Sequence, residues 1–323
     1  AQAAQGTHAQ PLRSVMGADR SGALRSLELA SRSPRAFVAR GFLDPSECVA
    51  LVALAKRLGS LRGQSGEDEG SDDEGEVAPW ANAIYDLPLW PATDGRLEAE
   101  ECALLESIYA RIDDLCASPR HADDASPSVR FTGPLRGAGA SQCRMTVGLH
   151  VDTNGSPFRF ATVIVYLADV AQPSGDGATV FPCAAVDEGG LVATEVQEVR
   201  AAGQALLEAG KTHTLNFTSA ELAAQKSTLL EAAEHHRGLS VAPEAGKLLL
   251  FFSLTDEGAV DPASWHAGAA VGEEPGPAGG KWFLQIFKTV PVDCRGQDAL
   301  ASFVAAHRAA PTVRPATFAE SGG

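Results

Sequence analysis

Gly148-Leu149-His150-Val151-Asp152-Thr153 is the stretch from which the fold and the chemistry of this chain are best predicted. Residues i and i+2 of a β-strand point to the same side, so a strand here would place His150 and Asp152 next to each other. An imidazole and a carboxylate held together are two of the three ligands of a 2-His-1-carboxylate site, which binds non-haem Fe(II). Because His-x-Asp also occurs by chance as a surface pair, a metal site additionally requires a third ligand.

His266 is the best-placed third ligand among the eight histidines of the chain. It follows a predicted strand and turn, and it precedes another predicted strand that opens with Lys281-Trp282. The remaining histidines fall in predicted tails, a polar loop, a charged helix end or a long insertion; they are His8, His121, His213, His235, His236 and His307. We therefore predict that His150, Asp152 and His266 form the metal site.

Three protein ligands leave three positions at Fe(II), of which a 2-oxo acid can fill two and O₂ the third. The far carboxylate of 2-oxoglutarate then needs a cation. Lys281 opens an otherwise apolar strand and suits this role, although a strand-end lysine can also extend its ammonium into solvent. Strand parity puts Gln285 on the same side, where it would line the pocket. Arg159 either contacts substrate or cosubstrate or pairs with a surface acid.

Helices are predicted before the metal-binding stretch, and strands predominate after it. Asp44 is a predicted N-cap, with Pro45 at the first position of a helix that runs to about residue 58. A second helix is predicted over about 98–115. Strands are predicted at 35–43, 158–167, 247–252 and 282–287, with a short strand ending at Pro182. The fold class is therefore α+β, with a double-stranded β-helix (jelly-roll) core buttressed by N-terminal helices.

We expect one catalytic domain over residues 34–292. It lies between a flexible N-terminal segment, 1–33, in which 21–29 has a helical pattern, and a C-terminal tail, 293–323, with a helix at 298–308. An insertion at 184–240, with a predicted helix at 220–233, elaborates the barrel and is not a separate domain.

An acidic loop is predicted at 64–78. Seven acids within 67–76 favour a solvated loop, and the alternative is an acidic lid that attracts a basic substrate.

Composition limits the kinds of partner and environment that we expect for this chain. A net charge of −15 disfavours nucleic-acid binding. The six cysteines are scattered without a C-x-x-C motif, so free thiols are expected. Because no apolar run approaches the ~20 residues of a membrane span, we expect a soluble protein that does not enter a membrane. The compartment stays open between the cytoplasm and, if a signal peptide was removed, the lumen of the secretory pathway.

Taken together, these motifs resemble the prolyl 4-hydroxylase-like branch of the Fe(II)/2-oxoglutarate-dependent dioxygenases. The resemblance covers about 37–60 and 142–290, and its motifs are His150-x-Asp152, Arg159-x-Ala-Thr-Val-Ile-Val-Tyr-Leu, Gly177-Ala-Thr-Val-Phe-Pro182, Val241-x-Pro-x-x-Gly246-Lys-Leu-Leu-Leu-Phe, Trp265-His266 and Gly280-Lys281-Trp282. It implies that His150, Asp152 and His266 are the catalytic iron ligands and that Lys281 binds 2-oxoglutarate. Arg159 and Gln285 are further candidates for cofactor binding.

The activity implied by this resemblance is hydroxylation of an unactivated C–H, that of a prolyl residue in a peptide or protein. The reaction uses Fe(II), 2-oxoglutarate and O₂, and ascorbate is a candidate reductant for the iron. Two alternatives stay open: the same chemistry on a small molecule or modified nucleobase, and a non-catalytic jelly-roll binding protein. Substrate choice is open because the chain departs from the family near the site: Arg144 is followed by Met145 instead of tyrosine, and 184–240 and 272–280 are longer.

Overall fold

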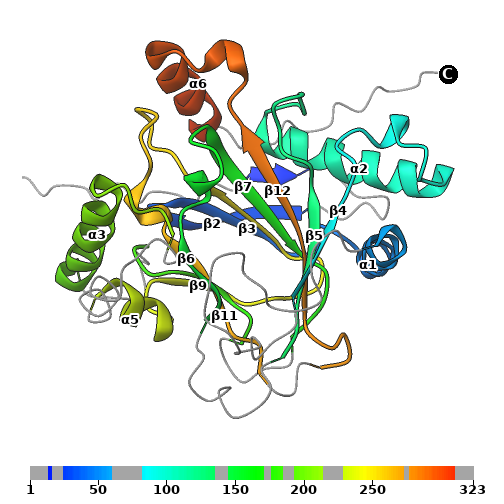
Figure 1. Ribbon diagram of the computed structural model, residues 1–323, viewed down its shortest axis with the longest axis horizontal. Coiled ribbons are helices and arrows are strands. Elements are labelled where there is room, and N and C mark those ends of the chain that lie inside the picture. Colours follow the sequence, from blue (N-terminus) through cyan, green and yellow to red (C-terminus); the bar gives the residue numbers. More distant parts are fainter. Residues whose placement is uncertain are drawn as a thin grey trace, which may run out of the picture.

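Two antiparallel sheets form the centre of the computed structural model, which describes residues 14–16, 25–59, 82–134, 145–170, 176–184, 193–213, 228–272 and 276–309. In these ranges the large sheet has eight strands in the order β1-β2-β3-β10-β7-β12-β5-β4, and the small sheet has four in the order β6-β11-β8-β9. Helices lie on the outer side of each sheet (Figure 1). The predicted combination of helices with antiparallel strands is confirmed.

The strands have the following bounds. Those of the large sheet are β1 (Ser14–Met16), β2 (Arg25–Arg32), β3 (Arg35–Ala39), β4 (Asn82–Asp86), β5 (Ser128–Thr132), β7 (Arg159–Tyr166), β10 (Leu248–Phe252) and β12 (Lys281–Thr289). Those of the small sheet are β6 (Met145–His150), β8 (Thr179–Phe181), β9 (Leu239–Val241) and β11 (His266–Ala269). The four predicted strands and the short strand before Pro182 are all present, as β3, β7, β10, β12 and β8.

The central strand β7 is buried on both faces, which explains its continuous apolar sequence. Val163 and Val165 point to the helices, whereas Thr162, Ile164 and Tyr166 point to the small sheet. The neighbouring strand β12 alternates in the same way, since Gln285 is paired with Ile164. Strand alternation therefore places Thr162, Tyr166 and Gln285 on the face of the large sheet that is turned towards the small sheet.

Two helices cover the other face of the large sheet, as predicted. The first, α1 (Pro45–Leu58), begins at the N-cap Asp44, whose carboxylate accepts from the Glu47 N–H at 2.9 Å while the Glu47 carboxylate accepts from the Asp44 N–H. Such a capping box stabilises a helix by about 1 kcal/mol. The second, α2 (Ala99–Cys116), packs beside it, and both lie on the same side of the large sheet in Figure 1.

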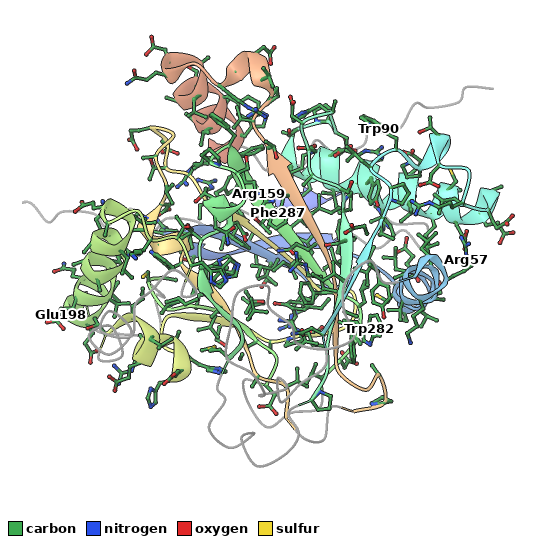
Figure 2. All side chains as sticks on the ribbon, viewed as in Figure 1. Arg57, Trp90, Arg159, Glu198, Trp282 and Phe287 are labelled. Atoms are coloured by element: carbon green, nitrogen blue, oxygen red, sulfur yellow. The ribbon has the colours of Figure 1, made fainter. Side chains whose placement is uncertain are left out.

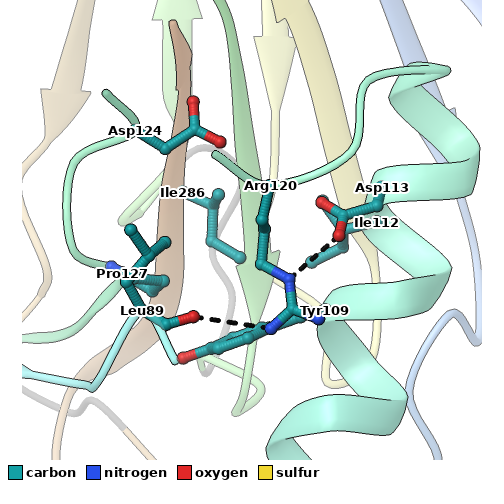
Figure 3. A pocket seen from close by; sticks show the side chains of 8 residues that line it. All are labelled: Leu89, Tyr109, Ile112, Asp113, Arg120, Asp124, Pro127 and Ile286. Atoms are coloured by element: carbon teal, nitrogen blue, oxygen red, sulfur yellow. Dashed lines mark hydrogen bonds and ion pairs between the residues drawn. The ribbon is translucent and has the colours of Figure 1, made fainter. Parts of the chain in front are cut away.

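A narrow pocket lies between α2 and the large sheet, on the face away from the small sheet (Figure 3). Its lining residues are Leu89, Tyr109, Ile112, Asp113, Arg120, Asp124, Pro127 and Ile286. Beside it the fully buried Lys288 ammonium contacts Asp113 at 3.2 Å and Asp124 at 2.8 Å. The two carboxylates neutralise the Lys288 ammonium, so this cluster links α2 to the large sheet and is not a candidate catalytic site.

The N-terminal prediction is wrong for residues 25–32. This stretch forms β2, which pairs with β3 in a register that places Leu27 opposite Ala39, whereas a helical pattern and flexibility were predicted. The physical reason is the adjacent partner strand, which returns after the turn at Ser33-Pro34 and buries Leu27. Pairing between neighbouring segments thus outweighs a weak helical pattern.

The C-terminal helix is confirmed as α6 (Gln297–Ala309). It is packed against the protein, since Val304 is fully buried and the Phe303 ring meets the Phe160 ring at a centroid distance of 5.2 Å. Residues 297–309 are therefore part of the core assembly in addition to being helical.

Two helices of the 184–240 segment cover the outer face of the small sheet (Figure 1). They are α3 (Ala193–Glu208), which was not predicted, and α5 (Leu229–Glu234), which corresponds to the end of the helix predicted at 220–233. The Trp265 indole N–H donates to the Gly203 carbonyl of α3 at 3.1 Å. This segment therefore packs directly behind the strands that carry the predicted metal ligands.

Several predictions concern residues outside the described ranges, among them the acidic loop 64–78, Arg144 and Cys143. The described cysteines, Cys48, Cys102, Cys116, Cys183 and Cys294, are free thiols, as predicted. No helix in the described ranges combines the length and apolar character of a membrane span.

Candidate metal centre and cosubstrate pocket

Alternation along two neighbouring strands brings the two histidines together. In β6, Leu149 points outward to the helices of the 184–240 segment, so His150 points inward; in β11, Ala267 points outward and His266 inward. The strands pair with His266 directly opposite His150, and the two rings have a centroid distance of 4.2 Å. Local strand parity is therefore sufficient to create the histidine pair.

Asp152 completes the cluster from a position just beyond β6. It begins a short 3-10 turn, η2 (Asp152–Asn154), instead of continuing the strand, yet its side chain still faces the histidines. The Asp152 Oδ1 atom lies 3.4 Å from His150 Nε2 and 3.6 Å from His266 Nε2. In the described part of the chain this is the one group of three acidic, histidine or cysteine side chains whose ligand atoms all lie within 4.8 Å of one another.

Main-chain carbonyls hold both imidazoles in the orientation that a metal requires. His150 Nδ1 lies 2.8 Å from the Gly148 carbonyl oxygen, and His266 Nδ1 lies 3.0 Å from the Ser264 carbonyl oxygen. Each contact places the ring N–H on Nδ1, which leaves the Nε2 lone pair facing Asp152. The other carboxylate oxygen, Asp152 Oδ2, accepts a hydrogen bond from the Thr162 hydroxyl at 2.5 Å.

The protonation states suit a divalent cation. Burial alone would raise the pKa of Asp152, but His266, His150 and the Thr162 hydroxyl outweigh it and hold that pKa well below its usual value. Burial and the nearby His150 lower the pKa of His266 to about 4, so its imidazole is neutral at pH 7. Two imidazole nitrogens and one carboxylate fit Fe(II) in number and chemistry.

Lys281 is a buried cation on the opposite sheet. It is 5% exposed, and its ammonium lies 4.9 Å from the centre of the Phe283 ring and 5.5 Å from that of Tyr166. Burial lowers its pKa to about 7, and no hydrogen bond or ion pair satisfies it within the described ranges. The Tyr166 hydroxyl donates to the Val241 carbonyl oxygen at 3.2 Å and lies 2.8 Å from the Thr179 hydroxyl. An ammonium and a neighbouring hydroxyl suit a carboxylate.

Tyr166 and Thr179 were missed as candidates in the sequence. Tyr166 could have been found by strand parity, since it faces the same side of the sheet as Thr162 and is paired with Phe283. Thr179 belongs to the other sheet, and its approach to Tyr166 depends on how the sheets pack.

Arg159 and Gln285 lie on the same face of the large sheet as Lys281. The Arg159 guanidinium donates to the Asp152 carbonyl oxygen at 3.1 Å and lies 3.9 Å from the centre of the Phe287 ring, beside which Figure 2 shows it. In these contacts Arg159 pairs with a carbonyl oxygen and an aromatic ring instead of the surface acid that the sequence offered as an alternative. Gln285 is 7% exposed, and in the described part of the chain its Oε1 atom has no hydrogen-bond partner.

His213 belongs to the 184–240 segment, where the sequence predicts no ligand, yet it lies beside the predicted metal ligands. The Thr212 carbonyl accepts from the Val151 N–H at 3.0 Å, and His213 is paired with His150 across an isolated bridge. The two rings have a centroid distance of 5.4 Å. No local sequence pattern predicts this contact, because it depends on the path that the segment takes after α3.

Comparison with known proteins connects this geometry to one group of enzymes. Prolyl 4-hydroxylase 2 of Arabidopsis thaliana is 25% identical over 253 residues, covering 78% of this chain and 68% of that protein. Probable prolyl 4-hydroxylase 10 of the same plant is 27% identical over 266 residues, covering 79% and 70%. The chain is a relative of the prolyl 4-hydroxylases. No protein-family model matches it.

Among solved structures, the viral collagen prolyl hydroxylase of Paramecium Bursaria Chlorella virus-1, in its 2-oxoglutarate complex, aligns with 79% of this chain and 96% of its own, at 14% identity and a TM-score of 0.41. At that score the structural similarity adds nothing to the sequence relationship. The assignment to the prolyl 4-hydroxylase relatives therefore depends on the aligned sequences together with the cluster of His150, Asp152 and His266.

Proposed function

We propose that this chain is an Fe(II)- and 2-oxoglutarate-dependent dioxygenase that hydroxylates prolyl residues of a peptide or protein. The observation that carries the proposal is the cluster of His150, Asp152 and His266 facing the buried ammonium of Lys281, which forms no ion pair with any described residue. The names of the plant relatives support the prolyl substrate. We further propose that the two sheets form the jelly-roll core of a single domain, which comprises the expected residues 34–292 together with β1, β2 and α6.

The metal would be held by His150 Nε2, His266 Nε2 and Asp152 Oδ1. Bound Fe(II), together with 2-oxoglutarate and O₂, supplies oxidative decarboxylation coupled to hydroxylation: one oxygen atom enters succinate, CO₂ leaves and the other oxygen becomes the hydroxyl of the product. The protein supplies ligand orientation through the carbonyls of Gly148 and Ser264, as described above. Ascorbate is the proposed reductant.

The cosubstrate would extend from the metal to Lys281, with its far carboxylate on the ammonium and on the hydroxyl of Thr179. Lys281 must be protonated to bind a carboxylate, and the arriving negative charge would raise its pKa back towards the usual range. Apolar rings close the space around His266: the Phe181 and Phe251 rings lie at centroid distances of 5.3 Å and 4.8 Å from its imidazole. Such walls exclude water from the reacting groups.

The decisive experiment measures succinate release from 2-oxoglutarate with a synthetic peptide of alternating proline and alanine, and measures hydroxyproline in the same samples. We expect both products to require Fe(II) and to be lost in His150→Ala and Asp152→Ala. His235→Ala is the matched control, because this exposed histidine lies in the segment behind the small sheet and should behave as wild type. Succinate release that persists undiminished in both ligand variants would refute the site, and succinate without hydroxyproline would refute the prolyl substrate.

A further inference from the structure

Gln285 is a buried polar side chain among mostly apolar neighbours on the large sheet. In β12 it lies between Phe283 and Phe287, and it is paired with Ile164 of β7 on one side and Ser128 of β5 on the other. It shares a face with Lys281, the face towards the small sheet. The side chain is 7% exposed, and its Oε1 has no hydrogen-bond partner among the residues that the structure describes. A buried carbonyl oxygen without a donor is unfavourable, so a bound molecule is the natural source of one.

Gln285 lies along the sheet between the metal corner and the anchor, since its diagonal neighbours on β7 are Thr162 and Tyr166. Phe287 is paired with Thr162, the residue whose hydroxyl bonds Asp152, so Gln285 is the diagonal neighbour of Thr162. Lys281 lies four residues away along the strand, which is about 13 Å of backbone at the usual rise of a strand. A group bound at the metal is therefore within reach of the Gln285 carboxamide.

The missing partner must be a hydrogen-bond donor, which limits its identity. Both ends of 2-oxoglutarate present only acceptor oxygens at neutral pH, so the cosubstrate cannot satisfy Gln285 Oε1. A peptide offers main-chain N–H groups at every residue except proline. The chemistry of this unsatisfied oxygen therefore favours the peptide over the cosubstrate.

We propose that Gln285 is a substrate-binding residue whose Oε1 accepts a hydrogen bond from a main-chain N–H of the bound peptide. The proposal rests on the proposed prolyl hydroxylase function and adds a sequence preference to it. Because proline has no N–H, the residue that contacts Gln285 cannot be proline. The protein should prefer peptides in which proline alternates with another residue over uninterrupted proline runs.

The test compares wild type with Gln285→Met, which keeps the length of the side chain and removes its polar atoms. Each protein is loaded with Mn(II) and 2-oxoglutarate, and the Kd values of an alternating proline–alanine peptide and of decaproline are measured by calorimetry. Wild type should bind the alternating peptide about tenfold more tightly, as expected for one buried hydrogen bond, and Gln285→Met should lose this preference. The KM for 2-oxoglutarate should not change.

N-methylation of the peptide locates the bond. With N-methylalanine at each alanine position in turn, one position should weaken binding to wild type about tenfold and have no further effect on Gln285→Met. Ile286→Met is the matched control, because the neighbouring side chain points to the helices and should leave both preferences intact.

Three results would overturn the proposal: an unchanged preference in Gln285→Met, a raised KM for 2-oxoglutarate with unchanged peptide Kd, or no methylated position that distinguishes the two proteins. Failure of the underlying function is recognisable separately, since wild type would then release no Fe(II)-dependent succinate or would bind neither peptide. In that case both proposals fall.

Discussion

Lys281 should destabilise the protein when 2-oxoglutarate is absent. Its pKa falls from 10.5 in a free lysine to about 7 because burial desolvates the ammonium, which meets no anionic partner within the described ranges. The unfolded chain therefore binds a proton between pH 7 and pH 10.5 that the folded chain does not, so the stability of the folded state rises with pH in this window. Burying this lysine lowers the free energy of unfolding by about 4 kcal/mol at pH 7 and by about 2 kcal/mol at pH 9.

The variant Lys281→Met removes this penalty. We expect its free energy of unfolding, measured by urea denaturation without metal or cosubstrate, to exceed that of wild type more at pH 7 than at pH 9, with a change of about 2 kcal/mol between the two. Comparing the two proteins at each pH cancels the titration of all other groups. Saturating 2-oxoglutarate should stabilise wild type and leave Lys281→Met unaffected.

Lys288→Met is the matched control on the same strand. Lys288 is also fully buried, but it contacts Asp113 and Asp124. Its removal takes a cation from both carboxylates, of which Asp113 keeps Arg120 at 2.9 Å, and should destabilise the protein by about 3 kcal/mol or more. A difference between Lys281→Met and wild type that stays constant from pH 7 to pH 9 would refute the idea of a desolvated, unpaired ammonium.

Three further predictions concern affinity and packing. The Kd of 2-oxoglutarate, measured by calorimetry, should rise by up to about tenfold per pH unit above pH 7, because only protonated Lys281 binds the carboxylate; a flat profile would contradict this. Gly246→Ala should lower the free energy of unfolding in urea by about 3 kcal/mol, because φ is +76° and a Cβ would lie 2.1 Å from the Leu43 carbonyl oxygen; wild-type stability would contradict it. Gly203→Ala should weaken Mn(II) binding several-fold in a metal titration, because its Cβ would lie 2.9 Å from the Trp265 ring that precedes His266; equal Mn(II) affinity would show that the ring can move freely.

The clustering of His150, Asp152 and His266 was predictable because its geometry is mostly local. Strand parity explains why His150 and His266 face inward while Leu149 and Ala267 face outward. The choice of His266 among eight histidines followed from its place between two predicted strands. The position of Asp152 in a 3-10 turn did not matter, since its side chain still points to the histidines.

The parts that escaped prediction depend on segments distant in sequence. The strand at 25–32 exists because β3 pairs with it, and His213 reaches His150 because the chain returns along the edge of β6. The contact between Tyr166 and Thr179 depends on the spacing of two sheets. Periodicity within one segment carries no information about such contacts.

The division of the site between two sheets has a consequence for the choice of 2-oxo acid. The three proposed metal ligands come from the end of β6 and from β11 in the small sheet, whereas Lys281 belongs to β12 in the large sheet. The separation between metal and ammonium is then set by the distance at which the sheets pack, which buried rings such as Phe181 and Phe251 hold constant. A rigid gap of this kind would accept a five-carbon diacid and reject both oxaloacetate and 2-oxoadipate by length, and the bound diacid would tie the two sheets to each other.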